Sequence, residues 1–141
     1  MKEAHILLVE DNEGDVFLTL DAFDECKIKT KISVVRNGGE ALDFLFRREG
    51  YENADRPDLI LLDINIPIYN GHEVLKAIKE DLYLKKIPVI MLTTSSNQRD
   101  INLAYEHHAN SYIIKPIELD DFLKAILQIE EFWLQLSRLS D

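Results

Sequence analysis

Five apolar runs of strand length alternate along the chain with segments whose apolar residues recur at helical spacing. The runs occupy residues 6–9, 32–35, 59–62, 89–92 and 112–114. The helical segments cover residues 15–23, a stretch that follows Asn37-Gly38-Gly39 and includes Phe46, and residues 74–82, 98–106 and 119–136. Continuous apolar strands are typical of a parallel sheet covered by helices on both faces. The alternation predicts an α/β fold with a doubly wound, five-stranded parallel sheet and five helices, in one domain over residues 1–141.

The charge of the chain restricts its partners. Its 141 residues carry a formal net charge of −10, which opposes binding to nucleic-acid phosphates and to anionic membranes. No apolar run approaches the roughly 20 residues that a membrane helix needs, and the first residues do not match a signal peptide. The lone cysteine, Cys26, has no partner for an intrachain disulfide. We therefore expect a cytoplasmic protein that binds neither nucleic acid nor a membrane.

Polar side chains follow four of the five predicted strands at the point where each strand ends. Glu10 and Asp11 follow the first strand, and Asp63 follows the third. Thr93 follows the fourth strand and Lys115 the fifth. Because ligands of open α/β sheets bind at the carboxyl ends of the strands, we expect these side chains to form one site.

The expected site combines residue types that suit phosphoryl transfer. Carboxylates that lie close together repel one another and raise one another's pKa. A hard divalent cation removes that cost, and Mg²⁺ accepts a few carboxylates together with water. With a metal ion, a lysine and a hydroxyl to neutralise phosphoryl oxygens, an ionised carboxylate can act as the nucleophile. The residues therefore predict Mg²⁺-dependent formation of an aspartyl phosphate.

The order and spacing of these residues resemble the receiver domain of bacterial two-component response regulators. Each motif alone is a weak signal, but the ordered set is specific and covers essentially the whole chain. The resemblance implies the flavodoxin-like strand order 2-1-3-4-5. It rests on Glu10-Asp11, Asp63, Pro67, Gly71, Thr93, Tyr112 and Lys115-Pro116.

The resemblance implies a role for each residue of the site. Asp63 would be the phosphoacceptor, and Lys115 would pair with the phosphoryl oxygens. Mg²⁺ would be bound directly by Asp11, Asp63 and the backbone carbonyl of Asn65, while Glu10 would act largely through water.

The resemblance also implies a switch. Thr93 would move toward the phosphoryl group, Tyr112 would swing inward behind it, and the bond before Pro116 would be cis. A sensor histidine kinase would supply the phosphoryl group, and the response would be a changed affinity for a protein partner. Such a domain catalyses only its own phosphoryl transfer and autohydrolysis, so we do not class it as an enzyme.

Two positions depart from the family pattern. Glu10 stands where aspartate is commoner. Its side chain is one methylene longer than that of aspartate, which affects the arrangement of ligands around the metal ion. Thr94 is bulkier than the alanine or glycine often found after the switch threonine, so it could narrow the access of small phosphodonors or of water. Asn65 and Ser95 occupy positions that tune hydrolysis in relatives.

The segment after Lys115 is expected to form an apolar helix over about residues 119–136. We therefore expect the domain to pass on its signal by contact with another protein. One apolar stripe of this helix can face the sheet. A second apolar stripe makes the apolar surface too wide for a single buried face. The second stripe either folds over the chain's own core or forms a partner or homodimer surface, and we prefer the latter. It contains Phe122, Ile129, Trp133 and Leu136.

Three further stretches, VEDNEGD, RPDLILLDINIP and IEEFWL, resemble a subgroup of stand-alone receivers. Members of that subgroup serve phytochrome-type or other hybrid sensor histidine kinases and can dimerise. This resemblance predicts the class of kinase without naming it.

Other interpretations stay open at this point. Glu10 and Asp11 could cap the first helix, Lys115-Pro116 could be an ordinary turn, and Tyr112 could be a sheet-edge aromatic. We assign Ser95 and Ser96 to a polar loop that leads into a helix. The rival function is a Mg²⁺-dependent aspartyl-phosphate phosphatase acting on a small phosphoester, and a third is a constitutive interaction module whose site is unused.

Overall fold

The structure is a computed structural model, and it describes residues 3–25 and 29–115. Strands and helices alternate along these residues as the apolar pattern predicts. In chain order they are β1 (Ala4–Val9), α1 (Glu13–Glu25), β2 (Thr30–Val35), α2 (Gly38–Leu45), β3 (Leu59–Leu62), α3 (Gly71–Glu80), the short 3₁₀ helix η1 (Leu84–Lys86), β4 (Val89–Thr93), α4 (Gln98–Glu106) and β5 (Ser111–Ile114).

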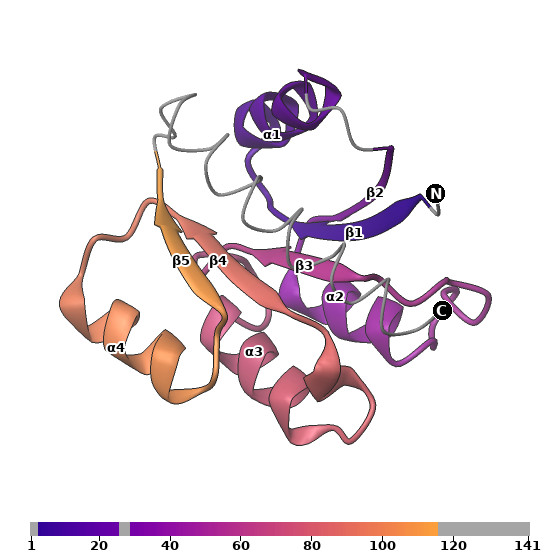
Figure 1. The fold of residues 1–141 in the computed structure, drawn as a ribbon. Helices are drawn as coiled ribbons and strands as arrows, with labels where there is room; N and C mark the ends of the chain where they lie inside the picture. Colours follow the sequence, from indigo (N-terminus) through magenta and orange to yellow (C-terminus); the bar gives the residue numbers. More distant parts are fainter. Residues whose placement is uncertain (1–2, 26–28, 116–141) are drawn as a thin grey trace.

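The strands form one parallel sheet in the order β2-β1-β3-β4-β5, which confirms the predicted topology (Figure 1). In the centre of the sheet, Val9 at the end of β1 lies beside Val35 of β2 and Leu62 of β3. Thr93 at the end of β4 pairs with Ile114 of β5. The strands therefore end together along one edge of the sheet.

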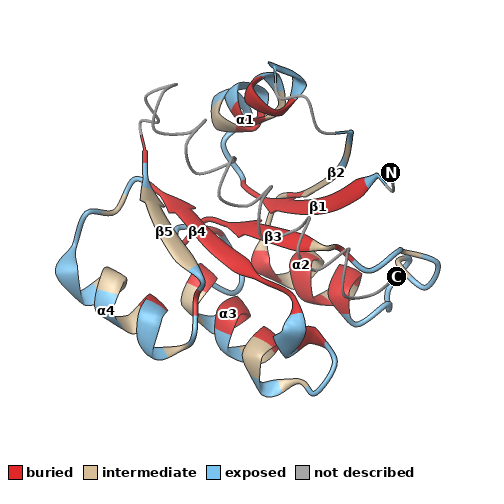
Figure 2. Ribbon diagram, viewed as in Figure 1, coloured by how far each residue is buried: buried red, intermediate tan, exposed pale blue. Residues whose placement is uncertain are grey.

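The helices cover both faces of the sheet, with α1 on one face and α2, α3 and α4 on the other (Figure 1). Side chains of β1 alternate between the two layers. Ile6 and Leu8 pack in a cluster with Phe23 of α1, whereas Leu7 and Val9 belong to the larger cluster under α2 and α3. All residues of β1, β3 and β4 are buried (Figure 2), as expected for central strands of a doubly wound sheet.

Asparagine side chains begin all four described α-helices, and Asn12 accepts a hydrogen bond from the backbone of α1. Asn37 accepts a hydrogen bond from the backbone of α2, Asn97 from that of α4, and Asn70 forms a reciprocal capping box with Glu73 at the start of α3. Such caps satisfy backbone donors that have no partner within the helix. The predicted helix over residues 98–106 is confirmed at both ends.

Two apolar residues that we predicted on helix faces lie beyond the helix ends. Phe46 is the C-cap of α2 and is partly exposed, and Leu82 follows the end of α3 with 71% of its surface exposed. The side chain of Asp81 accepts hydrogen bonds from the backbone N–H groups of Tyr83 and Leu84, both at 2.9 Å. These bonds end α3 and start η1, so Leu84 takes the buried position instead of Leu82.

The predicted fifth helix over residues 119–136 lies outside the described residues, as do Cys26 and Pro116. In the part of the chain that the structure describes, no helix combines the length and the apolar character needed to cross a membrane.

Candidate functional site

Backbone hydrogen bonds continue the sheet by one residue beyond the strands and place the predicted site residues side by side. The N–H of Asp63 donates to the carbonyl oxygen of Val9 at 3.1 Å. The N–H of Lys115 donates to the carbonyl oxygen of Thr93 at 2.7 Å. The expectation that these residues share one sheet edge is therefore correct.

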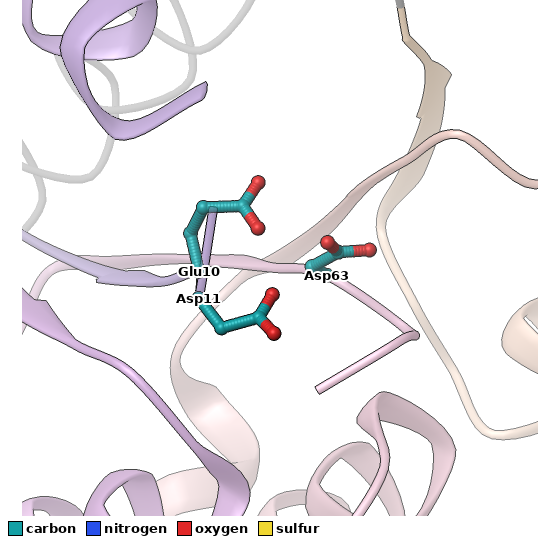
Figure 3. Close-up of side chains that lie close together, drawn as sticks. All are labelled: Glu10, Asp11 and Asp63. Carbon is teal, nitrogen blue, oxygen red and sulfur yellow. The ribbon is translucent and has the colours of Figure 1, made fainter. Parts of the chain in front are cut away.

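Three carboxylates meet at this edge. Each of Glu10, Asp11 and Asp63 offers an oxygen, and these oxygens lie within 4.8 Å of one another (Figure 3). Glu10 and Asp63 are buried, whereas Asp11 is exposed. The cluster is thus closed by the sheet on one side and open to solvent at Asp11.

The raised pKa of Glu10 shows that the ionised form of this side chain is unfavourable in the cluster. Burial raises the pKa of this carboxyl group from 4.5 to about 7, the nearby Lys115 opposes the rise, and Asp63 adds to it. Protonation would relieve the repulsion between Glu10 and Asp63, and so would a bound cation. In the absence of a metal ion, this site therefore binds protons more tightly than exposed carboxylates do.

The donor set fits a hard divalent cation. Carboxylate oxygens are the ligands that Mg²⁺, Mn²⁺ and Ca²⁺ prefer, and three of them converge with one exposed member through which an ion can enter. Asn65, whose backbone carbonyl is the predicted additional ligand, is exposed beside Asp63. Among the described residues, this is the one group of His, Cys, Asp or Glu side chains with metal-binding spacing.

The loop after Asp63 depends on Gly71. The N–H of Gly71 donates to the carbonyl oxygen of Ile64 at 2.8 Å, which closes the loop back onto the end of β3. A Cβ atom at Gly71 would lie 2.3 Å from the carbonyl oxygen of Asp63 and 2.7 Å from the Cα of Ile64. Glycine is therefore required for α3 to start this close to the candidate phosphoacceptor.

Lys115 places its ammonium group among the carboxylates. Its Nζ contacts Glu10 Oε1, lies 2.9 Å from Asp15 Oδ2 and lies 3.5 Å from Asp63 Oδ2. Burial would lower the pKa of Lys115, but its bonds to Glu10 and Asp15 and the charge of Asp63 outweigh this effect and raise it. Lys115 therefore stays charged within the buried site.

Asp15 is the site residue that sequence reasoning missed. We placed it at the start of the first helix and gave it no chemical role. The available signal was its position one helical turn beyond the acidic pair Glu10-Asp11, but helical spacing alone does not show which strand end the side chain reaches. The structure brings Asp15 into contact with Lys115, across 100 residues of sequence.

The predicted switch residues are connected through Ser95. Thr93 is fully buried, and its Oγ1 accepts a hydrogen bond of 3.3 Å from the N–H of Ser95. The half-buried Tyr112 donates its hydroxyl hydrogen bond to the carbonyl oxygen of Ser95 at 2.8 Å. Thr94, between Thr93 and Ser95, is exposed.

Ser95 also contacts a second polar group, which extends the network away from the carboxylates. Its hydroxyl donates to Asp100 Oδ2 at 2.6 Å, and Asp100 Oδ1 lies 3.1 Å from Nε2 of His72. The hydroxyl of Ser95 is the main cause that lowers the pKa of Asp100, with His72 adding to it. Our assignment of Ser95 to a polar loop is thus incomplete, because Ser95 contacts β5 and α4 directly and is linked to α3 through Asp100.

The remaining predicted residues cannot be placed. Pro116 and the apolar stripe of the last segment lie outside the described residues, so their predicted roles stay predictions. That stripe consists of Phe122, Ile129, Trp133 and Leu136.

Comparison with known proteins gives one consistent family. The model of the response regulator receiver domain matches residues 6–127. The response regulator Rcp1 of Synechocystis sp. is 44% identical over 130 residues, which covers 92% of this chain and 88% of Rcp1.

Solved structures agree with this match. The phosphorylated cyanobacterial phytochrome response regulator RcpA has a TM-score of 0.84 and 44% identity, covering 94% of this chain and 95% of the RcpA chain. The Mn²⁺-bound form of Rcp1 has a TM-score of 0.83 and 44% identity, with coverage of 93% and 94%. The RcpA structure is that of a phosphorylated protein. The Rcp1 structure contains a bound divalent metal ion.

Proposed function

We propose that this chain, which belongs to the response regulator receiver family, is a switch controlled by phosphorylation of Asp63. Receiver-domain response regulators are components of two-component systems and generally act as phosphoacceptor switches. The observation that carries the assignment is the position of Asp63 within a cluster of carboxylates and 3.5 Å from the ammonium group of Lys115.

Asp63 is the carboxylate best placed to act as the nucleophile. One of its oxygens accepts a hydrogen bond of 3.3 Å from the N–H of Asn65, and the other faces Lys115. In the transfer, an oxygen of Asp63 bonds to phosphorus while the phosphorus–nitrogen bond to the kinase histidine breaks. The leaving imidazole nitrogen keeps the electron pair and takes a proton from solvent. Lys115 offsets charge on the phosphoryl oxygens.

The acidic cluster holds Mg²⁺ during this reaction. Asp11 and Asp63 would be its side-chain ligands, the backbone carbonyl of Asn65 would be a third ligand, and Glu10 would act through water. When bound, the ion would neutralise negative charge on the phosphoryl oxygens. The convergence of the three carboxylates and the Mn²⁺-bound form of Rcp1 support a divalent cation here.

The switch operates through the hydrogen bonds of Ser95. For its hydroxyl to reach the phosphoryl group, Thr93 gives up the bond that it accepts from the Ser95 N–H. The same residue holds Tyr112 through its carbonyl oxygen. A shift of Ser95 therefore frees the tyrosine to turn inward and changes the surface formed by α4 and β5, which alters partner affinity.

The phosphodonor is a sensor histidine kinase, of the phytochrome type or a hybrid kinase. The description of RcpA as a phytochrome response regulator supports this assignment. We also propose that the apolar stripe after residue 119 binds a partner or a second copy of the chain. The chain hydrolyses its own aspartyl phosphate but turns over no metabolite, and no observation here favours a phosphatase of small phosphoesters.

Phosphate-affinity gel electrophoresis tests the assignment of Asp63. The protein is incubated with acetyl phosphate or phosphoramidate, with Mg²⁺ or with a chelator, beside the variants Asp63→Asn and Asp55→Asn. Asp55 is a matched control because its exposed carboxylate pairs only with Lys31 among the contacts described. Binding of beryllofluoride, an analogue of the phosphoryl group, is measured in parallel, since it does not depend on a donor passing Thr94.

A shifted band in wild type and Asp55→Asn that needs both Mg²⁺ and Asp63 is the expected result. A band that persists in Asp63→Asn would move the phosphoacceptor to another residue. Absence of both the band and beryllofluoride binding in wild type would refute the switch.

A further inference from the structure

The ammonium group of Lys115 is saturated with carboxylate partners. A lysine ammonium has three N–H donors, and Lys115 Nζ has three acceptors: Glu10 Oε1, Asp15 Oδ2 and Asp63 Oδ2. For Lys115 to pair with a phosphoryl group on Asp63, some of these bonds must be exchanged. The partners that remain determine where the ammonium group stands at that moment.

The three partners are not equivalent. Glu10 and Asp63 also belong to the cluster that converges at metal-binding spacing, whereas Asp15 does not. In the metal-bound protein, Asp63 would turn an oxygen toward the cation and Glu10 would turn one toward water on the cation, which would weaken the hold of both carboxylates on Lys115. Asp15 is then the carboxylate whose full charge still faces the ammonium group.

Two hydrogen bonds hold the backbone of Asp15 in place. Its N–H donates to Oδ1 of Asn12 at 3.0 Å, and its carbonyl oxygen accepts from Oγ1 of Thr19 at 2.8 Å. Both bonds lie in the first turns of α1. The carboxylate is 29% exposed, compared with 5% for the side chain of Lys115, so solvent screens this ion pair only in part. A rigid helix end thus presents one carboxylate to a buried cation.

We propose that Asp15 is a positioning residue that holds Lys115 beside Asp63 when Glu10 and Asp63 are engaged with the metal ion. With one N–H anchored on α1, the ammonium group keeps its other donors directed at the phosphoryl oxygens. The inference rests on the proposed function, and it adds a fourth carboxylate whose role is to orient the lysine. It does not make Asp15 a metal ligand.

The simpler alternative is that Asp15 only stabilises the start of α1, where an acidic side chain is favourable for the helix dipole. Glu13 is in the same turn and provides a matched control. Its side chain is more exposed and pairs with Arg36 at the surface. The substitutions Asp15→Asn and Glu13→Gln each remove one negative charge from the first turn, but only the first removes a charge that faces Lys115.

Two affinities separate these roles. Isothermal titration gives the affinity for Mn²⁺ alone and, at saturating Mg²⁺, the affinity for beryllofluoride. For Asp15→Asn we expect beryllofluoride to bind about fivefold to tenfold more weakly than to wild type, because the acceptor that faces Lys115 loses its negative charge. We expect the affinity of Asp15→Asn for Mn²⁺ to be no weaker than that of Glu13→Gln. Glu13→Gln should bind beryllofluoride as wild type does.

Equal beryllofluoride affinity in Asp15→Asn and Glu13→Gln would overturn the inference while leaving the switch at Asp63 intact. A loss of Mn²⁺ affinity in Asp15→Asn that matches its loss of beryllofluoride affinity would also overturn it, because Asp15 would then serve the metal. A wild-type protein that binds no beryllofluoride would instead refute the proposed function itself. Thermal unfolding of all three proteins without metal shows whether α1 remains folded.

Discussion

The hydroxyl group of Tyr112 donates a hydrogen bond of 2.8 Å to the carbonyl oxygen of Ser95. This bond joins β5 to the segment between β4 and α4, on which Thr93 ends the strand. The same serine donates its N–H to Thr93 and its hydroxyl to Asp100. Ser95 therefore connects the buried threonine beside the carboxylates to the tyrosine at the edge of the sheet.

Removing the hydroxyl group in Tyr112→Phe should lower the free energy of unfolding by about 1 kcal/mol, because one partly buried hydrogen bond is lost. Urea denaturation measures the change. Phosphorylation of Asp63 should persist, since the hydrogen bond of the tyrosine hydroxyl goes to Ser95 and not to a carboxylate. The control is Tyr105→Phe, which alters an exposed tyrosine. An equal loss of stability in both variants would contradict the role of the bond to Ser95.

A methyl group at Gly71 should damage both stability and phosphorylation. In Gly71→Ala, the new Cβ would meet the carbonyl oxygen of Asp63 at 2.3 Å, so the backbone of the phosphoacceptor must move. We expect a loss of about 2 kcal/mol or more in unfolding free energy and a weaker Asp63-dependent band on the gel. Gly14→Ala is the comparison, because its Cβ would meet a side-chain atom at 3.3 Å. Wild-type behaviour of Gly71→Ala would show that the loop is not tightly packed.

Stability of the metal-free protein should fall as pH rises through the range in which Glu10 ionises. The pKa of Glu10 is raised from 4.5 to about 7, chiefly by burial. Between these values the folded protein keeps a proton that the unfolded chain has released, so this contribution is complete below pH 4.5 and is lost as the pH passes about 7. Its size is on the order of 3 kcal/mol.

The variant Glu10→Gln should lack this decline with pH. Urea denaturation at several pH values in the presence of a chelator measures it, with Glu80→Gln as a control because Glu80 is exposed at the end of α3. Equal slopes for wild type and Glu10→Gln would show that Glu10 is not protonated near neutral pH.

Divalent cations should stabilise the folded protein through the carboxylate cluster. Mg²⁺ or Mn²⁺ at 100 times its dissociation constant should raise the unfolding free energy of wild type by about 2.7 kcal/mol. Differential scanning calorimetry would show this as a higher melting temperature that a chelator reverses. In Asp11→Asn the increase should largely disappear, because an exposed ligand is lost without disturbing the core. The same increase in wild type and Asp11→Asn would place the ion elsewhere.

Much of the candidate site could be predicted because parallel strands deliver their carboxyl ends to one edge. Glu10, Asp63, Thr93 and Lys115 each follow an apolar run, and the register of the strands brings them together. The contact between Asp15 and Lys115 could not be predicted in this way. It depends on how the first turn of α1 is oriented over the sheet, which helical periodicity does not specify.

The resemblance to receiver domains supplied the strand order 2-1-3-4-5. The sequence by itself determined the alternation of strands and helices and the identity of the side chains at the edge of the sheet. These follow from local burial patterns, since an apolar run must be covered and a charged residue at its end must not be. Tertiary structure alone decided that Leu84 rather than Leu82 is buried, that Ser95 joins Tyr112 to Thr93, and that Asp15 reaches Lys115. Each of these outcomes depends on how separate segments of the chain pack against one another to within ångströms. Hydrogen bonds form only over a narrow range of distance and angle, and the local sequence of each segment does not specify that packing.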